Sequence, residues 1–248
     1  MVFGKLGRKP AEYRTNTPRL ANFVVSEIPP VSSVDYTTKV ESPWQMLLND
    51  EIGDCTIAAV GHLVMGFSVT EDDPRLQMMS NEEALTYYKI IGKYDENDPT
   101  SDNGVVMTQV LDYWRHPGIR INTIPNTILG YTYLSPKNIP LMRYALRYFG
   151  GLYIGVMLPK STQDHMDYWD DIGDTQFLGG HCITLQGVDD NNDFYGITWG
   201  QRVRISSKFL ASYCDEMYLV LNHHFKNVDG LKMDELKQAL TLVHNQPI

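Results

Sequence analysis

The sequence predicts an α+β protein whose first half is mostly helical and whose second half is mostly an antiparallel β-sheet. Between residues 44 and 118, apolar residues recur at helical spacing. After Ile119, short apolar runs bounded by turn residues become the main pattern, as in strands. The 248 residues suffice for one large domain or two lobes around one cleft. We therefore expect a helical lobe at 44–118 and a β-rich lobe at 119–248, joined into one domain.

An extended arm is expected at residues 1–43, before the two lobes. This stretch contains five prolines and few periodic apolar positions. One short strand is expected within it at 22–25 and another at 34–36.

Three helices are expected in the first lobe, at 55–67, 84–91 and 105–114. The second of them follows Ser80-Asn81-Glu82-Glu83, which is a capping-box sequence. In the second lobe, helices are expected at 135–149 and 207–213. The expected strands are 120–124, 152–158, 181–188, 194–199, 203–205 and 217–221, with a long loop at 161–180.

Charge is distributed unevenly along the chain. The net charge is −9, which argues against nucleic acid as a general partner. Residues 1–20 carry five basic residues and one acidic residue, so the remainder carries −13. A basic arm on an acidic body predicts docking on its own body or on a protein partner, and the alternative is a solvated tail.

The three cysteines are too few and odd in number for a disulfide framework, which favours a reducing compartment. The first residues lack the apolar core of a signal peptide. The longest apolar run, 150–158, is too short to span a bilayer. We expect a protein without a membrane span that is cytoplasmic or associated with a virion.

The first candidate site residue is Cys55, which follows Gly53 and Asp54, residues typical of a turn and a helix N-cap. A cysteine in the first turn of a helix lies where backbone N–H groups and the helix dipole favour a thiolate. The alternative is a small buried cysteine at the start of a core helix.

His181 is the second candidate, at the start of an expected strand and after Gly179 and Gly180. A thiol on the helical lobe and an imidazole on the sheet lobe would face each other across one cleft. The imidazole could then take the thiol proton and stabilise the ion pair. This pattern predicts a Cys/His hydrolase.

The stretch Asn49-Asp50-Glu51-Ile52-Gly53-Asp54-Cys55-Thr56, followed later by Gly179-Gly180-His181, resembles the papain-like cysteine peptidase fold. The resemblance extends from about residue 34 to about 221 and is strongest to a bacterial and bacteriophage branch. It implies that Cys55 is the nucleophile and His181 its base. It also implies that Asn49, in place of a longer glutamine, donates to the oxyanion beside the Cys55 N–H.

The chain departs from the family at the third member of the site. The family has Asn-Ser-Trp-Gly about sixteen residues after the histidine, whereas this chain has Ile197-Thr198-Trp199-Gly200. Isoleucine cannot hydrogen-bond a ring nitrogen, and Thr198 could do so only if the strand is bulged or shifted by one residue. The substitution puts efficient proteolysis in doubt, while Trp199 could still shield the site from water.

The resemblance also implies substrate-binding residues. Asn103 and Gly104 match the loop that pairs with an extended substrate, and the alternative is an ordinary polar turn. Gly155 and Met157 match the strand that lines the side-chain pocket, and the alternative is plain core. No metal site or cofactor is expected, because zinc-type cysteine spacing and glycine-rich phosphate loops are absent from the sequence.

Three hypotheses follow. The first is a papain-like hydrolase that cleaves a peptide or other acyl bond. The second is a catalytically weak or inactive papain-like module with a structural or interaction role, for example in a bacteriophage virion. The third is amide hydrolysis or transamidation on a non-protein substrate such as cell-wall peptide. A groove filled by the chain's own arm would favour the second hypothesis or a self-blocked precursor.

Overall fold

A computed structural model describes residues 3–12, 14–25, 27–70, 77–223 and 227–244 of the chain. The α-helices are α1 (Cys55–Ser68), α2 (Asn81–Gly92), α3 (Met107–Arg115), α4 (Ile139–Phe149), α5 (Ser207–Tyr213) and α6 (Met233–His244). Single 3₁₀ turns lie at Leu20–Phe23, Pro99–Ser101 and Lys160–Gln163.

The strands form one large sheet and one small hairpin. They are β1 (Val34–Asp35), β2 (Ile119–Ile121), β3 (Ile124–Asn126), β4 (Ile128–Tyr133), β5 (Leu152–Pro159), β6 (Tyr168–Trp169), β7 (Phe177–Val188), β8 (Asp193–Thr198), β9 (Gln201–Ser206) and β10 (Cys214–Asn222). The large sheet has the order β4-β10-β5-β7-β8-β9-β6, with β1 added to β7, while β2 and β3 form the hairpin. Only the β6–β9 pair is parallel among the named strands.

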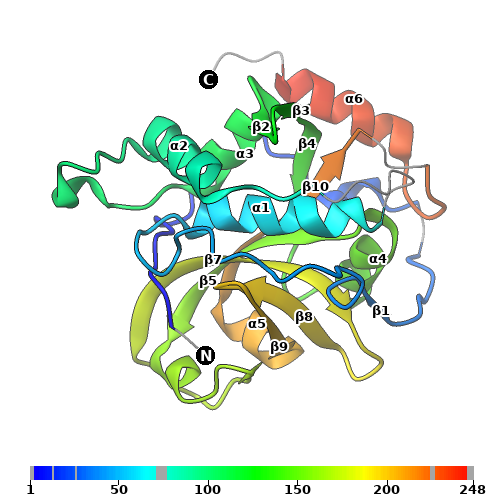
Figure 1. Ribbon diagram of the computed structural model, residues 1–248. Helices are drawn as coiled ribbons and strands as arrows, with labels where there is room; N and C mark the ends of the chain where they lie inside the picture. Colours follow the sequence, from blue (N-terminus) through cyan, green and yellow to red (C-terminus); the bar gives the residue numbers. More distant parts are fainter. Residues whose placement is uncertain (1–2, 13, 26, 71–76, 224–226, 245–248) are drawn as a thin grey trace.

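Helix α1 crosses the middle of the molecule and packs on β7, with α2 and α3 beside it and α5 on the other side of the sheet (Figure 1). All fourteen residues of α1 are buried, so it is a core helix without a polar face. Its first residue is Cys55, and it therefore delivers the thiol to β7, a central strand of the sheet.

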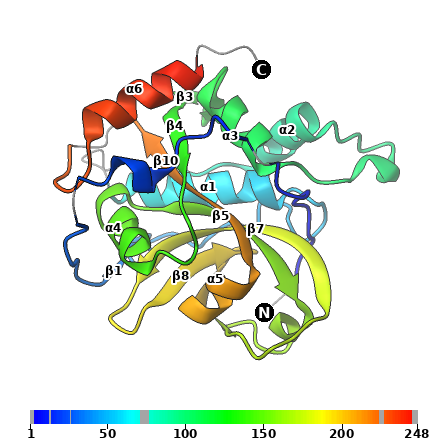
Figure 2. The same cartoon turned by 180° about the vertical axis from the view of Figure 1, so that it is seen from behind.

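The arm wraps the body and rejoins the sheet at β1, where Val34 pairs with Val188. Figure 2 shows it from behind, passing α3 and β4 and then α4 and α6 before it reaches β1. The prediction of a short strand at 22–25 is wrong for most of that range. A 3₁₀ turn occupies Leu20–Phe23, and only Val24 makes a bridge, to Leu231.

The expected α+β class is confirmed, and most of the expected elements are present. The expected helices at 55–67, 84–91, 105–114 and 207–213 match α1, α2, α3 and α5 within three residues at each end. The strand expected at 120–124 is instead the β2–β3 hairpin, broken by positive φ angles at Asn122 and Thr123. Strand β4 and helix α6 are not among the expected elements.

The caps of three helices can be compared with the sequence prediction. The capping box at Ser80 and Glu83 is confirmed in both directions. Asp54 occupies the N-cap position of α1, but its carboxyl makes no capping hydrogen bond, so that expectation is wrong. Helix α4 begins at Ile139 rather than 135, because Asn138 caps it and Pro140 occupies its first turn.

Across the described residues, none of the helices combines the length and the apolar character that crossing a bilayer requires.

We predict that Ser80→Ala lowers the free energy of unfolding by about 1 kcal/mol, because one end of the capping box is lost. Urea unfolding followed by circular dichroism measures the change. The matched control is Ser80→Asp, which keeps a capping oxygen and should stay close to wild type. Equal losses for both variants would contradict a capping role.

Candidate active site

The Cys55 thiol lies where α1 meets β7. The residue is 1% exposed, and its thiol receives backbone hydrogen bonds from Cys182 and Gly7. Cys182 directly follows His181 in β7, so the sheet places the imidazole one residue from a group that contacts the thiol. The tertiary fold therefore brings Cys55 to the strand that carries His181.

His181 is held by Thr198. The ring nitrogen Nε2 of His181 lies 2.7 Å from the hydroxyl oxygen Oγ1 of Thr198, and both side chains are buried. Among the described residues, the other ring nitrogen, Nδ1, has no hydrogen-bond partner. The imidazole is thus hydrogen-bonded through Nε2 and unpaired at Nδ1.

A β-bulge explains why Thr198, rather than Ile197, reaches the imidazole. Near the hairpin turn, Val188 pairs with Phe194, but beyond the bulge at Gln186 the pairing shifts by one residue, to Thr184 with Ile197. Directly opposed residues share a face of the sheet. With the shift, Ile197 shares the face of Thr184 and Thr198 shares the face of His181. An unbulged hairpin would reverse this assignment.

Trp199 covers the imidazole. Its ring stacks on His181 with centroids 4.5 Å apart and an angle of 22° between the planes. Trp199 and Gly200 form the two-residue turn between β8 and β9, and both have positive φ, at 47° and 65°. Positive φ is unusual for a bulky residue, and it turns the indole over the histidine.

The predicted oxyanion donor Asn49 is 2% exposed and binds the arm. Its amide nitrogen Nδ2 donates to the carbonyl oxygen of Lys5 at 3.2 Å, and the indole Nε1 of Trp199 donates to the same oxygen at 3.3 Å. The Lys5 N–H in turn donates to the Asn49 carbonyl at 2.6 Å. A peptide carbonyl of the arm therefore accepts from the predicted oxyanion donor Asn49, with Trp199 rather than the Cys55 N–H as the second donor.

The arm continues through the site next to the thiol. A Cβ atom on Gly7 would lie 1.7 Å from the carbonyl oxygen of Gly53, so only glycine allows this approach. Arg8 then donates from its N–H to the carbonyl of Gly180 at 3.2 Å. Residues Lys5 to Arg8 thus cross from Asn49 to the residue before His181 and cover Cys55.

Covering the site suppresses its charge. Burial raises the pKa of Cys55 to about 12, and the backbone hydrogen bonds from Cys182 and Gly7 offset only part of that rise. Burial, together with a smaller contribution from the positive charge of Arg8, lowers the pKa of His181 to about 3. At neutral pH the arm-covered pair is therefore a neutral thiol and a neutral imidazole.

Asp102 joins the walls of the site. Its carboxylate accepts from the Gly53 N–H at 2.9 Å and from the hydroxyl of Tyr88 at 2.5 Å. The Tyr88 hydroxyl accepts from the Gly104 N–H at 3.0 Å. The turn before Cys55 is thereby fixed to the loop that contacts the arm.

The loop pairs with the arm one residue later than predicted. Val105 donates to the Gly7 carbonyl at 2.8 Å and accepts from the Lys9 N–H at 3.0 Å. Gly104 does face the arm, since a Cβ there would lie 1.9 Å from the Gly7 oxygen. The side chain of Asn103 instead donates to the carbonyl of Thr100.

The pocket strand agrees better with the sequence prediction. A Cβ on Gly155 would lie 2.8 Å from Cδ of Arg8, so this position lines the occupied pocket. Met157 lies two residues further along β5, on the same face, and is partly buried.

Sequence reasoning did not identify several contacting residues: Lys5, Gly7, Arg8 and Val105, and also Asp215 and Glu216, which form ion pairs with Arg8. The opposite charges of arm and body were the signal for the arm, but they did not indicate which basic residue binds where.

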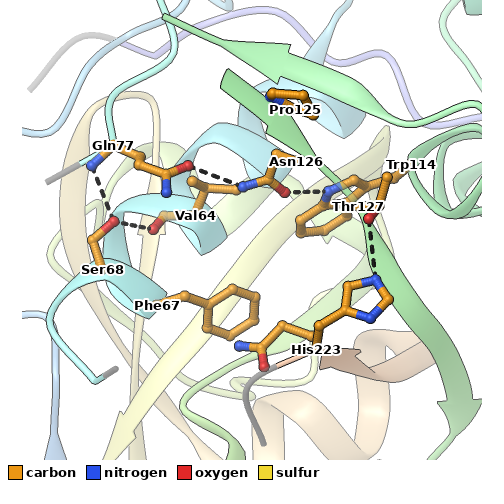
Figure 3. A pocket seen from close by; sticks show the side chains of 10 residues that line it. Val64, Phe67, Ser68, Gln77, Trp114, Pro125, Asn126, Thr127 and His223 are labelled. Atoms are coloured by element: carbon orange, nitrogen blue, oxygen red, sulfur yellow. Dashed lines mark hydrogen bonds between the residues drawn. The ribbon is translucent and has the colours of Figure 1, made fainter. Parts of the chain in front are cut away.

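A separate hollow lies near the far end of α1, about 20 Å along the helix from Cys55 at 1.5 Å per residue (Figure 3). Asn126 links its walls, since it donates to Gln77 and accepts from the indole of Trp114. The side chains of Thr127 and His223 are also hydrogen-bonded to each other. These polar groups are thus hydrogen-bonded to one another across the hollow.

Comparison with models of known protein families finds no match, and neither does comparison with curated protein sequences. Solved structures do match. The chain is similar to xylellain, a cysteine protease from Xylella fastidiosa, with 13% identity and a TM-score of 0.68, over 88% of this chain and 96% of that one.

Two further cysteine proteases are similar. One is CMS1MS2 of Carica candamarcensis in complex with E-64, with 13% identity and a TM-score of 0.57, over 78% of this chain and 99% of that one. The other is the ragweed pollen allergen Amb a 11 in its proform, with 13% identity and a TM-score of 0.56, over 80% and 67%. The chain therefore has the papain-like fold.

Proposed function

We propose that the protein is a papain-like cysteine hydrolase that cleaves peptide or related amide bonds and is self-blocked by its arm. The Cys55 thiolate attacks the carbonyl carbon while His181 holds the thiol proton. Asn49 and the Cys55 N–H stabilise the oxyanion. His181 then gives the proton to the leaving amine as the C–N bond breaks, and water hydrolyses the thioester with His181 as base.

The observation that carries this proposal is the contact between His181 and Thr198. The position that the family gives to asparagine holds isoleucine, yet a hydroxyl reaches the ring nitrogen Nε2 from the next residue. The hydrogen bond with Thr198, the unpaired Nδ1 and the amide at Asn49 together support a catalytic role for the imidazole. The same residues would serve a non-protein amide substrate.

A second candidate function is a module that binds but does not catalyse. It is favoured by the arm, which fills the groove, and by the raised pKa of Cys55, which opposes thiolate formation. The two candidates differ in what happens when the arm leaves. A hydrolase gains a reactive thiol and activity, whereas an inactive module gains only an open surface.

We predict that Arg8→Ala loosens the arm and makes Cys55 reactive toward iodoacetamide at pH 7. In wild type, a thiol pKa of about 12 leaves about one molecule in 10⁵ as thiolate at that pH. Because the folded pKa is raised, wild-type labelling should rise about tenfold per pH unit above pH 7. In Arg8→Ala, labelling of Cys55 should be faster at pH 7 and depend less on pH. Peptide mapping after labelling measures both rates.

The matched control is Lys5→Ala, which removes an equal charge from an exposed side chain of the arm. It should label as wild type does. If Cys55 of Arg8→Ala reacts no faster than Cys182 or Cys214, the activated thiolate is refuted.

We predict that Thr198→Val in the Arg8→Ala background lowers kcat/KM on fluorescein-labelled casein by about 10- to 100-fold, as for other partners that orient a histidine. Thr198→Ser keeps the hydroxyl and should retain most of the activity. The Val variant should also change the pH profile of kcat, because the imidazole loses its Nε2 partner. Equal activity of the two variants would exclude Thr198 as the orienting residue.

A further inference from the structure

The arm buries one complete cationic side chain beside the catalytic pair. The side chain of Arg8 has no exposed surface. Its Nη1 lies 2.7 Å from Oε1 of Glu216 and its Nη2 lies 2.9 Å from Oδ2 of Asp215. The side chain of Glu216 is only 2% exposed, so one of the two ion pairs is fully enclosed.

A second β-bulge creates this pair of carboxylates. Neighbouring residues of a regular strand point to opposite faces. In β10, however, the pairing with β5 shifts between Cys214 and Glu216, so that Cys214 opposes Val156 and Glu216 opposes Gly155. The extra residue, Asp215, can therefore reach the same guanidinium as Glu216.

The pocket also accommodates the aliphatic part of an arginine side chain. A Cβ on Gly155 would lie 2.8 Å from Cδ of Arg8 and 2.8 Å from the sulfur of Met107. Any side chain at position 155 would fill the space that the arginine occupies. The hydroxyl of Tyr218 donates to the second oxygen of Glu216 at 3.0 Å and fixes the carboxylate in place.

The main chain around Arg8 is held by backbone hydrogen bonds. The Gly180 carbonyl accepts from the Arg8 N–H. The backbone of Val105 makes hydrogen bonds with Gly7 and Lys9, the residues on either side of Arg8. Such backbone bonds carry no side-chain information apart from the glycine that the close approach of Gly7 to Gly53 requires, so further discrimination falls to the side-chain pocket. Once the arm leaves, the buried carboxylate of Glu216 has lost its ion-pair partner, and a cationic side chain can replace Arg8.

We propose that this pocket receives an arginine side chain of the peptide substrate, that Glu216 and Asp215 set the preference, and that Arg8 is its intramolecular occupant. The inference rests on the hydrolase proposed above and names its substrate class.

The test uses the full chain carrying Gly7→Val and Arg8→Ala, which evicts the arm by a clash with Gly53 and by loss of the ion pairs. Cys55→Ala is added for binding measurements. The probe is a fluorescein-labelled peptide with the sequence of residues 3–10. The matched probe has citrulline, an uncharged analogue of similar shape, in place of the arginine. Fluorescence anisotropy should give at least about tenfold tighter binding of the arginine probe, as expected for hydrogen bonds to a charged group.

Glu216→Gln should reduce the preference to less than threefold. Asp215→Asn should reduce it less, because the side chain of Asp215 is 40% exposed. Equal binding of the two probes to the arm-released chain would overturn the proposal.

Cleavage mapping separates this inference from the function on which it rests. The arm-released chain with Cys55 intact digests a mixture of peptides, and mass spectrometry maps the cut sites. Enrichment of arginine within two residues of the cut supports the proposal, and cleavage without enrichment overturns it. Arginine-selective binding without any cleavage refutes the hydrolase but supports the pocket as an arginine site.

Should the arm-released chain fail to fold, as judged by circular dichroism, the single variant Arg8→Ala serves instead. The arginine probe should then protect Cys55 from iodoacetamide at about one tenth of the concentration that the citrulline probe needs. Equal protection by the two probes would overturn the proposal.

Discussion

The antiparallel pairing of β7 with its neighbours is the constraint on which the site depends. This strand pairs with β5, β8 and β1 and receives the N-terminal end of α1. It carries His181, contacts Cys55 through Cys182, and accepts the Arg8 N–H at Gly180. A shift of one residue in its pairing would turn the imidazole and its hydroxyl partner to opposite faces of the sheet.

Two bulges set the chemistry of the cleft. The bulge at Gln186 brings Thr198 to the imidazole, and the bulge at Asp215 brings a second carboxylate to Arg8. Each allows a side-chain contact that regular strand alternation would prevent. The site therefore combines a helix start, which sets the position of the thiol, with local irregularities of the sheet, which set what surrounds the imidazole.

The arm covers the thiol and the imidazole and favours their uncharged forms. Its backbone bonds Asn49, Gly180 and Val105, and its arginine is enclosed by Asp215 and Glu216. These contacts remove water from the thiol and the imidazole, and removal of water disfavours their charged forms. The opposite charges of arm and body thus have a specific structural role, in addition to any effect on solubility.

Local patterns in the sequence determined the helix that begins at Cys55, the capping box at Ser80 and the strand that contains His181, because caps and periodicity act over a few residues. They also indicated the papain-like class through the order of the two boxes. Register, by contrast, is a property of paired strands, and a single strand does not contain it. Only the tertiary structure therefore decided that Thr198 replaces the missing asparagine, that Arg8 occupies the pocket, and that Val105 pairs with the arm.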